Sequence, residues 1–107
     1  MAAGDVTITF DTGRTIRGVR MIGGTVQLDG SNPTPVALAS YLRQVKGGVA
    51  SLEGSTALGD DPGAVTSAVS GTTLNVYAWK NTGGTDPTLV ASTDNARLVN
   101  WLAWGTP

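Results

Sequence analysis

The 107-residue chain contains neither cysteine nor histidine. Without histidine, no side chain titrates near neutral pH by default, and the Ser–His and Cys–His pairs of nucleophilic catalysis are excluded. Without both residue types, the usual ligands of structural zinc, haem and iron–sulfur clusters are missing as well. The lack of cysteine fits a reducing compartment, and it fits equally a particle later exposed outside the cell. The sequence therefore indicates a protein that is not an enzyme and that uses no metal or other cofactor.

Charge is also scarce, because charged residues make up 14% of the chain and the formal net charge is −1. That balance disfavours nucleic acid, since proteins that follow a phosphate backbone carry an excess of Lys and Arg. A surface of neutral polar residues suits packing against neighbouring proteins better than free diffusion. We therefore expect a protein partner, with no nucleic acid and no small-molecule substrate.

Long apolar runs are absent, and no segment approaches the roughly 18 apolar residues that a membrane span needs. The first residues lack the basic start and apolar core of a signal peptide. We accordingly expect no membrane association, and synthesis in the cytoplasm of the cell that makes the protein. The length predicts one domain, residues 1–107, with a short N-terminal arm at residues 1–5.

What the chain does contain is a series of alternating apolar and polar segments, which predicts eight or nine short strands. Turns rich in Gly, Asn, Asp and Pro separate them, and Gly23–Gly24 is expected to divide two of the strands. This pattern favours an all-β fold, a single-domain antiparallel β-sandwich or barrel. In the first segment the alternation places Val6, Ile8 and Phe10 on one face. The clearest segments are residues 6–10, 14–22, 25–29, 64–69, 74–80, 89–91 and 98–104.

Residues 36–53 allow two interpretations. Thr34 followed by Pro35 fits a helix start, and apolar residues at helical spacing lead to a glycine pair that fits a helix stop, so one short helix is possible around residues 35–46. The strand-rich surroundings instead favour strands at residues 36–39 and 41–53. We favour the strands and leave the short helix open.

Aromatic residues are few, and their positions on strands decide their interpretation. Both faces of residues 74–80 are apolar or aromatic, which predicts a central strand covered on both sides. An aromatic at strand spacing is more often core, so we expect Trp79 and Trp101 to be buried. Trp104 lies at the end of the last predicted strand and is the best candidate for a contact between chains.

Carboxylates are the remaining candidates for acid–base or metal chemistry. Asp60 and Asp61 are adjacent, but no calcium-loop pattern surrounds them, and neighbouring side chains in a turn diverge. We interpret the pair as a solvated turn. The one basic cluster comprises Arg14, Arg17 and Arg20, with acidic residues close by that offset its charge. We predict that these arginines, together with Trp104, contact a partner protein.

Four segments of strand and turn residues carry a resemblance: residues 26–36 (VQLDGSNPTPV), 74–80 (LNVYAWK), 86–93 (DPTLVAST) and 101–106 (WLAWGT). In these segments the chain resembles small virion proteins of tailed bacteriophages. The resemblance implies a head decoration (cement) protein, a β-rich structural protein that is often a homotrimer. Such a protein binds the major capsid protein on the outside of the head and stabilises the capsid lattice. The expected location is thus the capsid surface of the virion, after synthesis in the host cytoplasm.

A phage tail, baseplate or receptor-binding component is the alternative, because it would use the same kind of sandwich. An exposed Trp79 or Trp104 that stacks on host glycan would favour this alternative. In the decoration role, contacts with neighbours are expected from the N-terminal arm and from the loops at residues 30–35 and 81–88.

Overall fold

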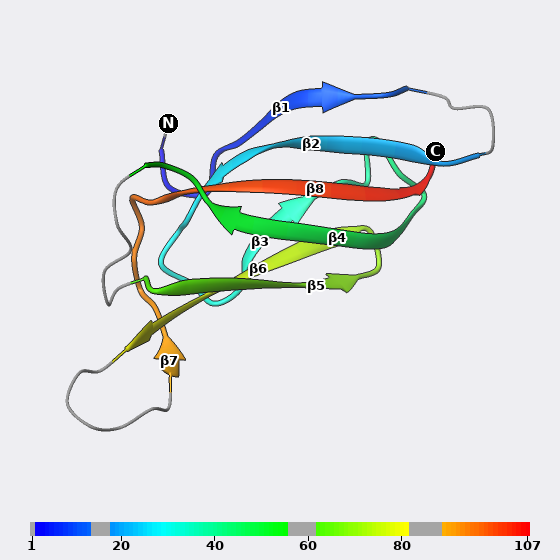
Figure 1. Ribbon diagram of the computed structural model, residues 1–107. Helices are drawn as coiled ribbons and strands as arrows, with labels where there is room; N and C mark the ends of the chain where they lie inside the picture. Colours follow the sequence, from blue (N-terminus) through cyan, green and yellow to red (C-terminus); the bar gives the residue numbers. More distant parts are fainter. Residues whose placement is uncertain (1, 14–17, 56–61, 82–88) are drawn as a thin grey trace.

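The computed structural model describes residues 2–13, 18–55, 62–81 and 89–107. These residues form two antiparallel sheets that pack face to face, which confirms the predicted all-β sandwich (Figure 1). The strands are β1 (Val6–Asp11), β2 (Arg20–Gln27), β3 (Thr34–Ala37), β4 (Gln44–Leu52), β5 (Ala64–Ser70), β6 (Thr73–Asn81), β7 (Leu89–Ala91) and β8 (Leu98–Thr106).

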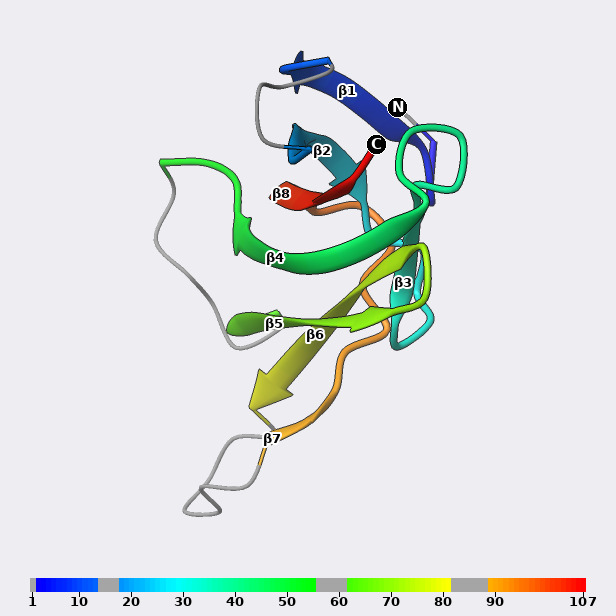
Figure 2. The same ribbon diagram turned by 90° about the vertical axis from the view of Figure 1, so that its right-hand side faces the viewer.

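Each sheet mixes strands from distant parts of the chain. Sheet A has the order β1-β2-β8-β4, and sheet B has the order β3-β6-β5, with β7 paired to the end of β6. The sheets approach each other most closely at β4 and β5, which lie side by side (Figure 2). There the Ser67 hydroxyl donates to the Gly48 carbonyl oxygen at 3.3 Å, and the Val45 amide donates to the Gly71 carbonyl at 3.2 Å. One long side of the sandwich is therefore nearly closed.

The core lies between the two sheets and follows the alternation of the strands. In β6 and β8 every second residue is buried and the intervening residues are more exposed, as the sequence pattern predicts. Trp101 is 3% exposed, which confirms its predicted burial. The buried apolar residues are Ile22, Val26, Leu28, Val36, Leu38, Leu42, Val45, Leu74, Val76, Ala78, Val99, Trp101 and Ala103.

The short helix that the sequence left open at residues 35–46 does not form. Strands β3 and β4 occupy the two ends of this segment. In the turn between them the amides of Tyr41 and Leu42 both donate to the Leu38 carbonyl at 2.9 Å, which makes one helix-like turn. This one turn brings both leucines into the core, so their helical spacing is satisfied without a helix. Pro35 is accommodated because, among the described strands, β3 lies at a sheet edge and pairs with β6 alone.

The glycine pair Gly23–Gly24 was predicted to separate two strands. This prediction is wrong, because both glycines lie in the middle of β2. Strand β1 has a bulge opposite this pair, between Ile8 and Phe10. A Cβ atom on Gly24 would lie 1.7 Å from the Thr7 carbonyl oxygen, so only glycine fits this close approach. The bulge also turns Phe10 to the face opposite Ile8. The prediction that both side chains share a face is therefore wrong.

Candidate functional site

The outer face of sheet A carries a row of apolar side chains that the core does not use. Two of them are among the most exposed large apolar residues described, Val49 at 53% and Phe10 at 49%. The other three are half-buried. We call this set the apolar stripe: Phe10, Met21, Val49, Leu102 and Trp104.

The pairing register shows that the stripe crosses all four strands of sheet A. Phe10 on β1 lies opposite Gly23, Gly23 lies opposite Leu102 on β8, and Leu102 lies opposite Val49 on β4. A Cβ atom on Gly23 would meet the Leu102 side chain at 3.2 Å and the Phe10 Cβ at 3.7 Å, so these two side chains converge over the glycine. The glycine thus makes the stripe continuous across β2.

Trp104, which the sequence analysis singled out for a contact between chains, is part of this stripe. Its indole lies over Gly47 of β4, where a Cβ atom would be 2.4 Å from the ring. Met21 is its partner on the other side, in β2. The Trp104 side chain therefore packs against the surface of the sheet, half-buried, beside the other apolar side chains. The sequence did not identify the other four stripe residues as contact residues. The apolar residues on both faces of the last strand were a signal that one of these faces lies outside the core.

The stripe ends in a shallow groove of about 240 Å³ above β4 and β8, where Val49 and Leu102 meet the polar residues Ser51 and Asn100. None of the paired, outward-facing positions of sheet A holds a charged residue. The bulge residue Lys46 of β4 is exposed next to Gly47. The apolar side chains of the stripe are costly to leave in water and gain by contact with another apolar surface.

Arg20 is bound within its own chain. Its Nη2 and Nε atoms donate to the two carboxylate oxygens of Asp11 at 2.6 and 2.9 Å, and its Nη1 donates to the Tyr41 carbonyl at 3.0 Å. The guanidinium also lies over the Tyr41 ring, 5.6 Å from its centroid. The Arg20 bond and the Gly13 amide lower the pKa of Asp11 to about 2. The predicted partner contact of Arg20 stays a prediction, and a partner would have to compete with these bonds.

Several sequence candidates lie outside the described residues. These are Arg14, Arg17 and the Asp60–Asp61 pair. The predicted contact loop at residues 81–88 is described only at Asn81.

The other predicted contact segments are anchored to the domain. In the loop before β3, Asn32 Oδ1 accepts the Ala78 amide at 2.8 Å. Burial alone would raise the pKa of Asp29, but hydrogen bonds from Ser31 and Thr34 outweigh it and lower the pKa. At the N-terminus, the Gly4 amide donates to the Gln27 carbonyl at 2.9 Å.

The outer face of sheet B carries a second feature, the aromatic pair Tyr77 and Trp79. Their rings are 6.0 Å apart between centroids and inclined by 8° to each other. Both side chains are half-buried and point away from the core, so the prediction that Trp79 belongs to the core is wrong. Strand β6 is central in its sheet, as predicted, but only its Leu74, Val76 and Ala78 face is fully buried.

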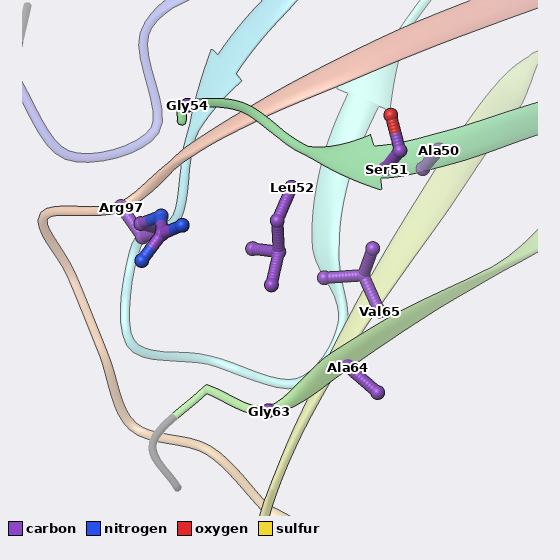
Figure 3. A pocket seen from close by; sticks show the side chains of 8 residues that line it. All are labelled: Ala50, Ser51, Leu52, Gly54, Gly63, Ala64, Val65 and Arg97. Atoms are coloured by element: carbon purple, nitrogen blue, oxygen red, sulfur yellow. The ribbon is translucent and has the colours of Figure 1, made fainter. Parts of the chain in front are cut away.

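A pocket of about 480 Å³ lies between the end of β4 and the start of β5 (Figure 3). Leu52 and Val65 point into it from the two strands, and Arg97 lies at its edge. The Arg97 Nε donates to the Glu53 carbonyl at 3.4 Å. The described lining thus offers apolar walls and one cation rather than paired carboxylates.

Across the described residues, no three acidic side chains gather where they could hold a metal ion. The same part of the chain has no helix long and apolar enough to cross a membrane. Comparison of the chain with protein-family models, with curated proteins and with solved structures gives no match.

Proposed function

We propose that this protein is a structural virion protein, a decoration protein that binds the major capsid protein on the outside of a phage head and stabilises the lattice. The observation that carries the proposal is the apolar stripe, which crosses all four strands of sheet A. A protein whose role is to lie against other proteins needs such a face.

The most exposed side chains of the stripe lie at its two ends, as suits a contact surface. Phe10 and Val49 are about half exposed at its two ends, so both would lose water contact against a partner. Burial of apolar surface contributes about 25 cal/mol per Å², which makes one such contact modest. On a capsid lattice, many copies and several contacts per oligomer convert modest contacts into stable binding.

Docking through the face of sheet A is favoured over the addition of a partner strand at β1. Strand β1 is an edge of sheet A, but its bulge between Ile8 and Phe10 interrupts the row of backbone groups that an added strand would need. The same bulge directs Phe10 into the stripe. The bulge thus disfavours strand addition at the β1 edge and adds an apolar side chain to the sheet face.

The first experiment measures the solution mass by light scattering, alone and after mixing with purified phage heads that lack the protein. We expect a trimer that saturates the heads at a fixed stoichiometry. Val49→Asp places a charge in the stripe, and we expect it to weaken head binding at least tenfold. Ala68→Asp is the matched control, because Ala68 is also exposed and outward-facing but lies on β5 in the other sheet.

Equal head binding by Val49→Asp and by the Ala68→Asp control would show that the stripe is not the contact surface. A wild-type monomer that ignores heads would contradict the decoration role itself. Melting temperatures of both variants check that the fold is kept, since exposed strand positions tolerate such changes at a cost of about 1 kcal/mol or less.

A tail or receptor-binding component that contacts host glycan is the second candidate. The aromatic pair Tyr77 and Trp79 favours it, because the rings lie on an outer face and are only half-buried. Head binding separates the two roles: a decoration protein saturates heads, whereas a receptor-binding component binds cells or their glycans and leaves heads bare.

A further inference from the structure

The outer face of sheet B differs from that of sheet A in its side chains. Its most prominent residues are two aromatic rings in a nearly parallel arrangement, Tyr77 and Trp79. The Trp79 Nε1 donates to the Thr66 hydroxyl at 2.8 Å, across the strand pair β5–β6. This bond fixes the orientation of the indole. The rings are therefore held in place before any ligand arrives, and less side-chain entropy is lost on binding.

Small residues flank the rings on the neighbouring strands. Ala64 on β5 lies opposite Trp79 on one side, and Ala91 on β7 lies opposite it on the other. Thr66 on β5 lies opposite Tyr77. Because these neighbours are short, no large side chain at the paired positions covers the ring pair.

The rest of this face is polar but uncharged. The paired, outward-facing positions hold hydroxyls, amides and small apolar groups, and none of them is an acid or a base. The face includes Pro35 and Ala37 of β3, Ala64, Thr66, Ala68 and Ser70 of β5, Thr73, Asn75, Tyr77, Trp79 and Asn81 of β6, and Leu89 and Ala91 of β7.

We propose that the outer face of sheet B binds a neutral glycan, with Tyr77 and Trp79 stacking on its sugar rings. The apolar C–H face of a pyranose is slightly electropositive and fits the negative face of an aromatic ring. The sugar hydroxyls then take hydrogen bonds from groups beside the rings, such as the Asn75 amide.

The absence of charge on this face selects the ligand class. Single-stranded nucleic acid also stacks on aromatic rings, but its phosphates need a positive groove, which these strand positions do not supply. A sulfated or carboxylated glycan has the same requirement. A neutral glycan is the ligand for which rings, hydroxyls and amides suffice.

The test measures binding of the full chain to immobilised neutral glycans, made of hexose, N-acetylhexosamine and deoxyhexose units, next to sulfated and sialylated ones. We expect binding to members of the neutral set only. Trp79→Ala should weaken it at least tenfold and Tyr77→Ala should weaken it as well. Trp79→Tyr, which keeps a ring, should retain most of the affinity.

Trp104→Ala is the matched control, because this tryptophan is also half-buried on a strand but lies on the outer face of sheet A. It should bind glycan like the wild type. Thr66→Val separates ring orientation from ring presence and should weaken binding less than Trp79→Ala. Melting temperatures show which variants keep their fold.

Failure to bind any neutral glycan would overturn the proposal, as would a preference for the acidic set. Equal loss in Trp79→Ala and Trp104→Ala would also overturn it, because the loss would then not be specific to the aromatic pair on sheet B. The glycan face and the apolar stripe are on different sheets, so glycan binding and head binding can be lost independently.

Discussion

At the scale of single residues, the Asp11–Arg20 pair predicts how the stability of the fold depends on pH. The pKa of Asp11 falls from its usual 3.8 to about 2, mainly through the hydrogen bond from Arg20. A carboxyl group whose pKa is lower in the folded state contributes stability above its unfolded pKa and loses it as the pH falls. The contribution of this pair is therefore complete above about pH 5 and disappears between pH 4 and pH 2.

We expect the stability difference between the wild type and Asp11→Asn to shrink as the pH falls through this range. Asp29 also has a lowered pKa, but it is present in both proteins and cancels in the comparison. Chemical denaturation at pH 6 and at about pH 2.5 measures the difference. Arg20→Gln should reduce the contribution of Asp11 to this pH dependence, because only the Gly13 amide would then lower the pKa of Asp11. Parallel pH curves for wild type and Asp11→Asn would contradict the assignment.

At the scale of strands, glycines determine where neighbouring strands come close. Gly24 lies opposite the bulge in β1, and Gly105 lies opposite a second bulge in β4, where a Cβ atom would be 1.9 Å from the Gln44 carbonyl oxygen. Both clashes are with backbone, which cannot move without breaking the strand pair. These two glycines are therefore required by packing between strands and not by their own backbone angles.

Gly24→Ala tests this distinction. We expect a loss of about 3 kcal/mol or more in the free energy of unfolding, because the β1–β2 pairing must shift. Gly71→Ala is the control: Gly71 has a φ of 61°, and no atom of the described residues lies within 4 Å of its Cβ position. That substitution costs about 1–2 kcal/mol for the left-handed backbone alone. Equal losses in the two variants, measured by urea denaturation, would mean that β1 adapts at the bulge.

The same glycines show where the sequence was informative and where it was not. The alternation in residues 74–80 and 98–104 is a local property, and it gave the correct faces of β6 and β8. The pair Gly23–Gly24 was interpreted as a turn because glycine is common in turns. In the structure, glycine is needed at position 24 because β1 comes too close for a side chain. A requirement that comes from a distant strand leaves no local pattern to recognise.

At the scale of the whole molecule, the stripe could not be assembled from the sequence. Its residues come from four strands that are adjacent only after pairing, and Phe10 joins them only because of a bulge. Trp104 was recognised from its position near the end of the last strand. Residue types that suit a core also suit an interface, and only the topology shows which side of the sheet they face.

The scarcity of charge acquires a structural meaning at this scale, because the paired outward-facing positions of both sheets are uncharged. Association through such faces depends on burial of apolar surface rather than on ion pairs. Salt screens ion pairs, since the Debye length falls from about 10 Å at 0.1 M to about 3 Å at 1 M, but it does not weaken apolar contacts. Sulfate strengthens apolar burial.

Head binding should therefore change little between roughly 0.1 and 1 M NaCl and should increase in ammonium sulfate. Contacts made by the arginine cluster would behave in the opposite way. Arg14, Arg17 and Arg20 facing acidic groups of a partner would give binding that falls steeply with salt. Measuring bound protein per head across this range distinguishes the two surfaces. If head binding weakens steeply with salt, the arginines and not the stripe form the contact with the head. Val49→Asp would then bind heads like the wild type.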